Sequence, residues 1–170
     1  MKKALVIIDM QRDFVDGSLA NLMAAAIVQP IVNYAKTYDG DLFATRDTHE
    51  QNYLETAEGQ RLPVVHCVHG TLGWEIVPPI LEVLKTRNAH IINKPTFGYL
   101  DWDCLQGYDE IELVGTCTDI CVVSNALILK AKFPNTNIKV NASLCAGTTV
   151  ENHAAALAVM QCCQIDVMNS

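Results

Sequence analysis

The sequence predicts a three-layer αβα sandwich with a mostly parallel, doubly wound β-sheet, formed by a single domain over residues 1–170. Short apolar runs rich in β-branched residues alternate with longer segments in which apolar residues recur at helical spacing. This alternation is typical of an α/β fold whose sheet is covered by helices on both faces. Half of the residues are hydrophobic and 18% are charged, which favours a buried core and argues against disorder. The length suits one domain, and no repeat or interdomain linker interrupts the chain.

Six apolar runs are predicted to be strands. The first, Ala4–Ile8, is continuously apolar, as expected of a strand that is covered on both faces. The other five predicted strands are Asp41–Thr45, Ala89–Asn93, Glu110–Val114, Ile138–Asn141 and Gln164–Met168. Right-handed crossovers would place the C-terminal ends of these strands along one edge of the sheet, where ligands bind in folds of this class.

Four segments between the strands are predicted to be helices. They are Leu19 to about Tyr38, Trp74–Lys85, Val122–Phe133 and Val150–Cys162. Pro78 and Pro79 belong to the first turn of the second helix or directly precede it, because proline is tolerated there. The stretch from Thr48 to Gly73 is long, polar and rich in turn residues, which predicts a loop with a functional role.

Charge, the length of the apolar runs and the cysteines indicate which partners and which compartment to expect. The net charge is −7 and no basic cluster is present, so we expect no nucleic-acid partner. The apolar run at the N-terminus is too short for a membrane span and lacks a signal-peptide cleavage site, so we expect no membrane association. The seven cysteines are odd in number and lie mostly in apolar runs, which predicts a reduced, cytoplasmic protein.

Polar residues follow the predicted strands at the edge where the strand ends should meet. Asp9 ends the first strand, Lys94 follows the third, and Cys121 lies just after the fourth, where a helix begins. The unpaired N–H groups and the dipole of a helix N-terminus favour a thiolate. A carboxylate could take the thiol proton, and an ammonium could orient both groups. Singly, these residues could be a turn aspartate, a surface lysine and a buried structural cysteine, but their joint placement predicts a nucleophilic site.

Three motifs carry a resemblance to a known family. They are Ile8-Asp9-Met10-Gln11-Arg12-Asp13-Phe14, Asn93-Lys94-Pro95-Thr96-Phe97-Gly98 and Gly115-Thr116-Cys117-Thr118-Asp119-Ile120-Cys121. In this order and at these spacings, the chain from Lys3 to its C-terminus resembles the isochorismatase-like cysteine hydrolases, a superfamily that includes nicotinamidases. The resemblance implies that Asp9 is the general base, Lys94 the supporting cation and Cys121 the nucleophile, which forms a thioester that water then hydrolyses.

The resemblance also implies an oxyanion hole. The family places a cis peptide bond in the turn before the nucleophile, and the matching bond in this chain is Thr116–Cys117. This bond would bring the backbone N–H of Cys117 beside that of Cys121. Two such donors stabilise the negative charge that develops on oxygen during acyl transfer.

The long loop contains a second group of candidate ligands. Asp47 and His49 lie two residues apart on an extended segment and point the same way, and His66 could complete a metal site. Without the resemblance to this family, Asp47, His49 and His66 could equally be unrelated polar residues that bind no metal. The resemblance implies that Asp47, His49 and His66 hold a divalent metal, which is zinc or alternatively iron or manganese. Some members add a glutamate, for which Glu58 is the nearest match and Glu55 the rival.

Aromatic residues near these groups could form a pocket for a flat ring. Phe14 matches a ring-stacking position of the family. Phe97, Tyr99 and Trp102 follow the third predicted strand and could supply the opposite wall. We therefore expect these four residues to bind the substrate.

The resulting prediction is a cysteine hydrolase that cleaves a small carboxamide, converting nicotinamide to nicotinic acid and ammonia. The alternative is a metal-independent isochorismatase-like hydrolase that acts on another small amide or on an enol ether. Two departures from the nicotinamidase pattern keep this alternative open: Leu62-Pro63-Val64-Val65 stands where an aromatic residue is common, and Ile120 stands where some members have histidine. A non-catalytic module of the same fold would lack one of the three catalytic residues. The resemblance also implies a homo-oligomer.

Overall fold

Six parallel strands form the central sheet of the computed structural model, which describes residues 1–170. The strands are β1 (Lys3–Ile8), β2 (Asp41–Asp47), β3 (His90–Lys94), β4 (Glu110–Thr116), β5 (Asn137–Ala146) and β6 (Asp166–Met168). Their spatial order is β3-β2-β1-β4-β5-β6, so β1 pairs with both β2 and β4. The chain winds outward in both directions from β1, which confirms the predicted doubly wound sheet and places a topological switch point at the end of β1.

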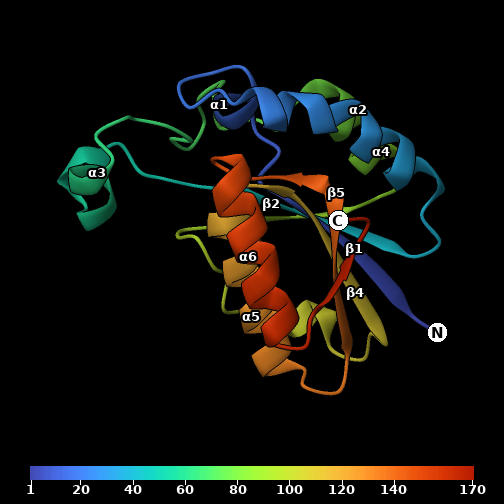
Figure 1. Ribbon diagram of the computed structural model, residues 1–170. Coiled ribbons are helices and arrows are strands. Elements are labelled where there is room, and N and C mark those ends of the chain that lie inside the picture. Colours follow the sequence, from blue (N-terminus) through green and yellow to red (C-terminus); the bar gives the residue numbers. More distant parts are fainter.

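Helices cover both faces of the sheet (Figure 1). On one face lie α2 (Leu22–Thr37) and α4 (Pro78–Thr86), and on the other lie α5 (Val123–Lys132) and α6 (Val150–Cys162). The connections contain the short helices α1 (Arg12–Val15) and α3 (Ala57–Arg61) and the 3-10 turns η1 (Tyr53–Glu55) and η2 (Asp103–Leu105). Figure 1 shows α3 standing apart from the layers, at one side of the molecule. None of these helices combines the length and the apolar character needed to cross a membrane.

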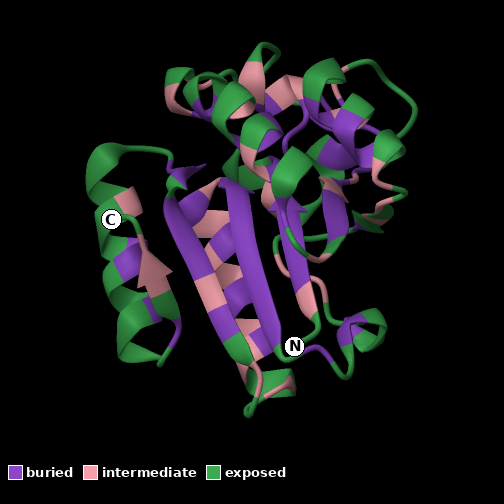
Figure 2. Ribbon diagram, turned by 90° about the vertical axis from the view of Figure 1, so that its right-hand side faces the viewer, coloured by how far each residue is buried: buried purple, intermediate pink, exposed green.

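The alternation of side chains along β1 supplies both halves of the core. Leu5 and Ile7 pack with α2 and α4, whereas Ala4, Val6 and Ile8 pack with α5 and α6. A strand covered on both faces must be apolar at every position, which is the pattern that the sequence has here. Figure 2 shows the long inner strands buried over most of their length, with the exposed residues on the outer sides of the helices and in the loops.

Two predicted helices begin later than the sequence suggested, and the first of them, α2, starts at Leu22 rather than at Leu19. The helix expected from Trp74 starts at Pro78, which together with Pro79 forms the first turn of α4. Proline fits there because the first N–H groups of a helix have no partner within the helix. The four residues before Pro78 therefore belong to the preceding connection, and the predicted start at Trp74 is wrong.

Two further differences from the predictions lie on the elements around the candidate site. The fifth strand was expected to end at Asn141, but β5 continues to Ala146, where it still pairs with β4. The helix expected from Val122 is preceded by a π-helical turn, η3 (Thr118–Val122), and α5 proper begins one residue later. The nucleophile candidate thus lies in an irregular turn rather than in the first turn of a regular α-helix.

Gly115 allows β1 and β4 to approach closely beside this turn. Its φ is +118°, and a Cβ atom at this position would lie 2.2 Å from the carbonyl oxygen of Ile8. Only glycine fits such a position without displacing backbone. Asp9, the residue after β1, also has a positive φ of 48°, and aspartate adopts this conformation more readily than most residues. The backbone at the ends of both central strands is therefore irregular at the edge where the candidate site lies.

Candidate active site

The C-terminal edge of the sheet brings the three predicted catalytic residues together. Lys94 ends β3, Asp9 follows β1, and Cys121 lies in η3 after β4. The side chain of Lys94 crosses β2, and its Nζ lies 2.7 Å from Asp9 Oδ2 and 3.5 Å from Cys121 Sγ. Asp9 and Lys94 are fully buried, and Cys121 is 5% exposed. Each charge therefore acts on the others with little screening by water.

Burial determines the protonation of this group. It raises the pKa of Asp9, which the ammonium of Lys94 partly counteracts. Burial by itself would lower the pKa of Lys94, but the nearby Asp9, Cys121 and Asp47 hold it above its ordinary value. Burial and the charge of Asp9 raise the pKa of the Cys121 thiol well above its ordinary value, despite Lys94. Burial and the charge of Asp9 therefore oppose the thiolate that a helix N-terminus was expected to favour.

The two carboxylate oxygens of Asp9 have different partners. Oδ1 accepts a hydrogen bond of 2.6 Å from the hydroxyl of Thr45. Oδ2 is paired in charge with Lys94 but receives no well-directed hydrogen bond, which is unusual for a buried carboxylate oxygen. The Cys121 thiol lies near this carboxylate, because both contact Lys94 Nζ. Oδ2 is thus an acceptor with spare capacity beside the only thiol that contacts Lys94.

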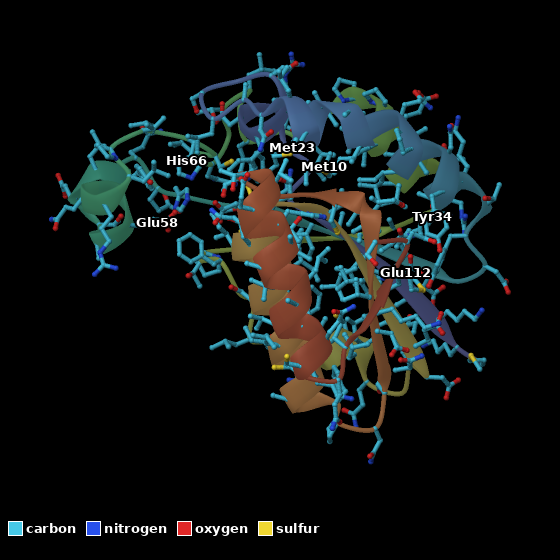
Figure 3. All side chains as sticks on the ribbon, in the orientation of Figure 1. Met10, Met23, Tyr34, Glu58, His66 and Glu112 are labelled. Carbon is cyan, nitrogen blue, oxygen red and sulfur yellow. The ribbon has the colours of Figure 1, made fainter.

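A second group of side chains lies beside the first. Asp47, His49, Glu58 and His66 each offer one ligand atom, and these atoms lie within 4.8 Å of one another. His49 Nε2 is 3.0 Å from Asp47 Oδ2 and 3.6 Å from Glu58 Oε1. His66 Nε2 is 3.8 Å and 3.9 Å from the same two oxygens. The rival Glu55 is exposed and lies outside the group. Figure 3 shows Glu58 and His66 together on the side of the molecule where α3 stands.

The donor atoms of this group fit a divalent metal ion. His66 Nδ1 lies 2.7 Å from the carbonyl oxygen of Val64, which assigns the ring proton to Nδ1 and leaves Nε2 free as a ligand. Burial by itself would lower the pKa of His49, but the hydrogen bond with Asp47 holds it above its ordinary value. The group therefore attracts positive charge to its centre. Two imidazoles with two carboxylates suit zinc, iron or manganese.

One cavity of about 620 Å³ opens onto both groups. Cys121, Asp47, Glu58 and His66 all line it, and no lysine or arginine does. The remaining lining residues are mostly apolar, and they are Phe14, Leu19, Ala20, Asn21, Leu22, Leu62, Phe97, Cys117, Ile120 and Thr148. A cavity of this kind, with a few converging polar groups, is the usual form of a small-molecule site.

Two of the four predicted substrate-binding aromatics line this cavity and two do not. Phe14 and Phe97 face it, but Trp102 is fully buried in the core beneath α5 and α6. Tyr99 packs edge-on against Trp102, with ring centroids 5.2 Å apart, and Trp102 Nε1 donates to Asn125 Oδ1. The prediction that Tyr99 and Trp102 form a pocket wall is therefore wrong, because their surfaces are used by the core.

The turn that carries the candidate nucleophile, Cys121, is held by a buried asparagine. The predicted cis peptide bond between Thr116 and Cys117 is present. Asn125 Nδ2 donates to the carbonyl oxygens of Cys121 (2.8 Å) and Phe97 (3.0 Å), and so ties this turn to the loop after β3. The sequence analysis did not single out Asn125, although a polar residue within the apolar face of a helix is a signal that could have found it.

Two residues of the first motif hold the candidate metal ligands, and the sequence analysis assigned neither of them a role. The fully buried amide of Gln11 bonds to both the N–H and the C=O of Asp47, at 2.7 Å and 2.8 Å. Asp13 Oδ2 accepts a hydrogen bond of 2.7 Å from the N–H of Cys67, the residue after His66. The sequence signal that could have found them is a polar residue at every second position after β1, namely Asp9, Gln11 and Asp13.

Comparisons with known proteins find similar proteins along the whole chain. A family model described as the isochorismatase domain matches residues 3–170. The chain is 28% identical to a nicotinamidase/pyrazinamidase of Mycobacterium tuberculosis, over 99% of both chains. It is 30% identical to an uncharacterized isochorismatase family protein, PncA, of Bacillus subtilis, over 92% of this chain and 93% of that protein. The structure of a pyrazinamidase of Pyrococcus horikoshii in complex with zinc superposes with a TM-score of 0.82 at 25% identity and covers all of both chains.

Proposed function

This chain belongs to the isochorismatase family, and from that premise we propose that it is a cysteine hydrolase that converts nicotinamide to nicotinic acid and ammonia. The observation that carries the proposal is the contact of Lys94 with both Asp9 and Cys121 at the wall of a mostly apolar cavity. The similarity to a nicotinamidase/pyrazinamidase over the whole chain supports the choice of substrate.

In the proposed reaction, Asp9 acts first as a general base. The carbon of the carboxamide meets Cys121 Sγ, the thiol proton passes to Asp9 Oδ2, and the sulfur forms a bond to that carbon. Because burial keeps the thiol protonated at rest, the proton leaves only as the new bond forms. The ammonium of Lys94 balances the negative charge on the sulfur during this step.

The remaining steps use the same groups in reverse. The backbone N–H groups of Cys117 and Cys121 would hold the oxyanion of the tetrahedral intermediate. Asp9 then returns its proton to the leaving nitrogen, and ammonia departs as the C–N bond breaks. A water molecule next gives a proton to Asp9 and attacks the thioester carbon. The C–S bond then breaks, nicotinic acid leaves, and Asp9 returns the proton to the sulfur, which restores the thiol.

We further propose that Asp47, His49, Glu58 and His66 hold a divalent metal, with zinc the first choice and iron or manganese the alternatives. The zinc complex of the Pyrococcus horikoshii pyrazinamidase supports zinc. When bound, the metal would supply a Lewis-acid position for the lone pair of a ring nitrogen in the substrate. These four residues fix that position on the same cavity as Cys121, so they would orient the carboxamide toward the sulfur.

The charge of the cavity bears on the alternative substrates. Asp47 and Glu58 line it, and no lysine or arginine opposes them there. An isochorismate-like enol ether carries carboxylates, which these residues would repel. An uncharged amide meets no such penalty, so the metal-independent alternative is supported for amides but not for such enol ethers.

A screen of ammonia release from nicotinamide, pyrazinamide, benzamide and aliphatic amides tests the proposal. We expect nicotinamide and pyrazinamide to react fastest, because only these two present a ring nitrogen. Cys121→Ala is the matched control, since it keeps the cavity and removes the sulfur. If metal-supplemented protein releases no ammonia from either heteroaromatic amide, the proposed function is wrong.

A further inference from the structure

The outer part of the active-site cavity is more extensively apolar than a small carboxamide requires. Six apolar residues form what we call the outer wall: Leu19, Ala20, Leu22, Leu62, Phe97 and Ile120. They come from four segments, namely the start of α2 with the connection before it, the end of α3, the loop after β3, and η3. A cavity of about 620 Å³ is of the size that holds ligands considerably larger than one six-membered ring.

Three outer-wall side chains are exposed in the free protein. Leu22 is 89% exposed, Phe97 41% and Leu62 40%. Single exposed apolar residues are ordinary, but several that gather at one place indicate a surface that a ligand or partner covers. These three belong to different segments and line one cavity that reaches Cys121. The occupant that best accounts for them is therefore part of a molecule that also reaches the nucleophile.

The polar residues of the outer part already have partners within the protein. The side chain of Asn21 accepts a hydrogen bond from the N–H of Met23 and donates to the carbonyl oxygen of Gly147. The N–H and hydroxyl of Thr148 both donate to the carboxylate of Asp119. With no lysine or arginine in the lining, the outer part offers a ligand apolar surface and little else. It thus suits an uncharged apolar group.

We propose that this site acts on heteroaromatic carboxamides whose ring carries an apolar substituent directed toward the outer wall. The inference rests on the proposed amidase function and adds a substrate class to it. The reaction is unchanged: the same C–N bond breaks, and ammonia leaves. The 5-alkylnicotinamides are the simplest members of this class, because the 5 position adjoins neither the ring nitrogen nor the carbon that bears the carboxamide.

The test compares kcat/KM for nicotinamide with that for its 5-methyl, 5-propyl and 5-pentyl derivatives. Each methylene that becomes buried against the outer wall should raise kcat/KM up to about fourfold, until the cavity is filled. The 5-carboxy derivative tests the charge argument, since a carboxylate at the same ring position should be a poorer substrate than nicotinamide.

A pair of matched variants assigns the effect to the outer wall. Leu22→Asn should lower the ratio of kcat/KM for 5-propylnicotinamide to that for nicotinamide. Leu72→Asn should keep this ratio, because Leu72 is also a highly exposed leucine (69%) but lies outside the cavity. Equal ratios in the two variants would show that the outer wall does not select the substituent, and would overturn the inference.

The remaining outcomes separate this inference from the function on which it rests. If nicotinamide is hydrolysed but no 5-alkyl derivative exceeds it, the inference fails and the amidase function stands. If no heteroaromatic amide is hydrolysed, the function fails and the inference with it. If light scattering shows a stable oligomer that Leu22→Asn dissociates, the exposed wall is an interface between copies and the inference is wrong.

Discussion

Lys94 Nζ lies 3.2 Å from Oδ1 of Asp47, whose other oxygen, Oδ2, lies 3.0 Å from Nε2 of His49. One carboxylate therefore connects the candidate catalytic residues to the candidate metal ligands. Burial by itself would raise the pKa of Asp47, but His49 and Lys94 hold it below its ordinary value, so this carboxylate is ionised. Its charge also raises the pKa of Cys121, which means that a change at Asp47 reaches the nucleophile.

Asp47→Asn should therefore alter both the metal affinity and the reactivity of Cys121, whereas His66→Ala should alter the metal affinity alone. Both variants should bind a divalent metal far more weakly, by more than the roughly 10–100-fold that loss of an outer partner costs. In the metal-free state, Asp47→Asn should speed the alkylation of Cys121 at pH 7.5, because a negative charge that disfavours the thiolate is gone. His66→Ala should leave that rate unchanged. Calorimetric metal titration and peptide mapping after brief alkylation measure the two properties, and equal alkylation rates in both variants would contradict the connection.

Cys121→Ala and Asp9→Asn should each lower kcat/KM by about 10⁴-fold or more, because the residues act as one unit. For the same reason the double variant should be no worse than the more damaging single one. Cys117→Ala is the control, since the role proposed for Cys117 belongs to its backbone N–H and should survive loss of the side chain. Ammonia release measured alongside circular dichroism decides the matter. A folded Cys121→Ala protein with comparable activity would exclude the thioester.

Alkylation of Cys121 in the free protein should increase with pH throughout the range from neutral to strongly alkaline. Burial and Asp9 raise the pKa of this thiol, so only a small fraction is thiolate near pH 7. Mass mapping after short exposure to iodoacetamide at a series of pH values gives the profile, with the exposed Cys162 in the same digest as an internal reference for the reagent. A plateau of Cys121 reactivity that already begins near pH 6 would indicate a resting thiolate instead.

The grouping of the candidate catalytic residues could be predicted because it follows from the parallel arrangement of the strands. Asp9, Lys94 and Cys121 each follow an apolar run at a point where parallel strands end, and no detail of packing is needed to bring them to one edge. The aromatic pair Tyr99 and Trp102 was assigned wrongly because nearness to Lys94 in the sequence does not fix the direction of a side chain.

Two other features also depend on packing. A helix start after the fourth strand was visible in the sequence, but the near-complete burial that raises the pKa of the Cys121 thiol was not. The extension of β5 to Ala146 depends on the register shift between β4 and β5 near Gly115. Neither burial nor register can be derived from a single strand's own residues, because both are properties of neighbours that lie far away in the chain.

Asp13→Ala should weaken metal binding by roughly 10–100-fold although Asp13 contacts no candidate ligand, as is common for residues that hold ligands in place. Its carboxylate bonds to the N–H groups of Cys67 and Ser18, and Cys67 has a φ of 46°, which few non-glycine residues adopt. Loss of these bonds should free the segment that carries His66. Metal titration of the apo-protein tests this, with Asp16→Ala as the control because Asp16 is exposed on the same connection. Wild-type metal affinity in Asp13→Ala would remove Asp13 from the site.

Removal of divalent metal should harm heteroaromatic amides far more than benzamide, since only the former present a ring nitrogen to a metal held by Asp47, His49, Glu58 and His66. Elemental analysis should find close to one ion per chain. Saturation at about 100 times the Kd should stabilise the fold by roughly 2.7 kcal/mol, or raise Tm by roughly 5–10 °C. His66→Ala should abolish this rise, and the exposed His69 provides the control, because His69→Ala should keep it. If no ion binds at near one per chain, the four residues are ordinary polar groups at the edge of the cavity, and the metal-independent amidase becomes the better description of this site.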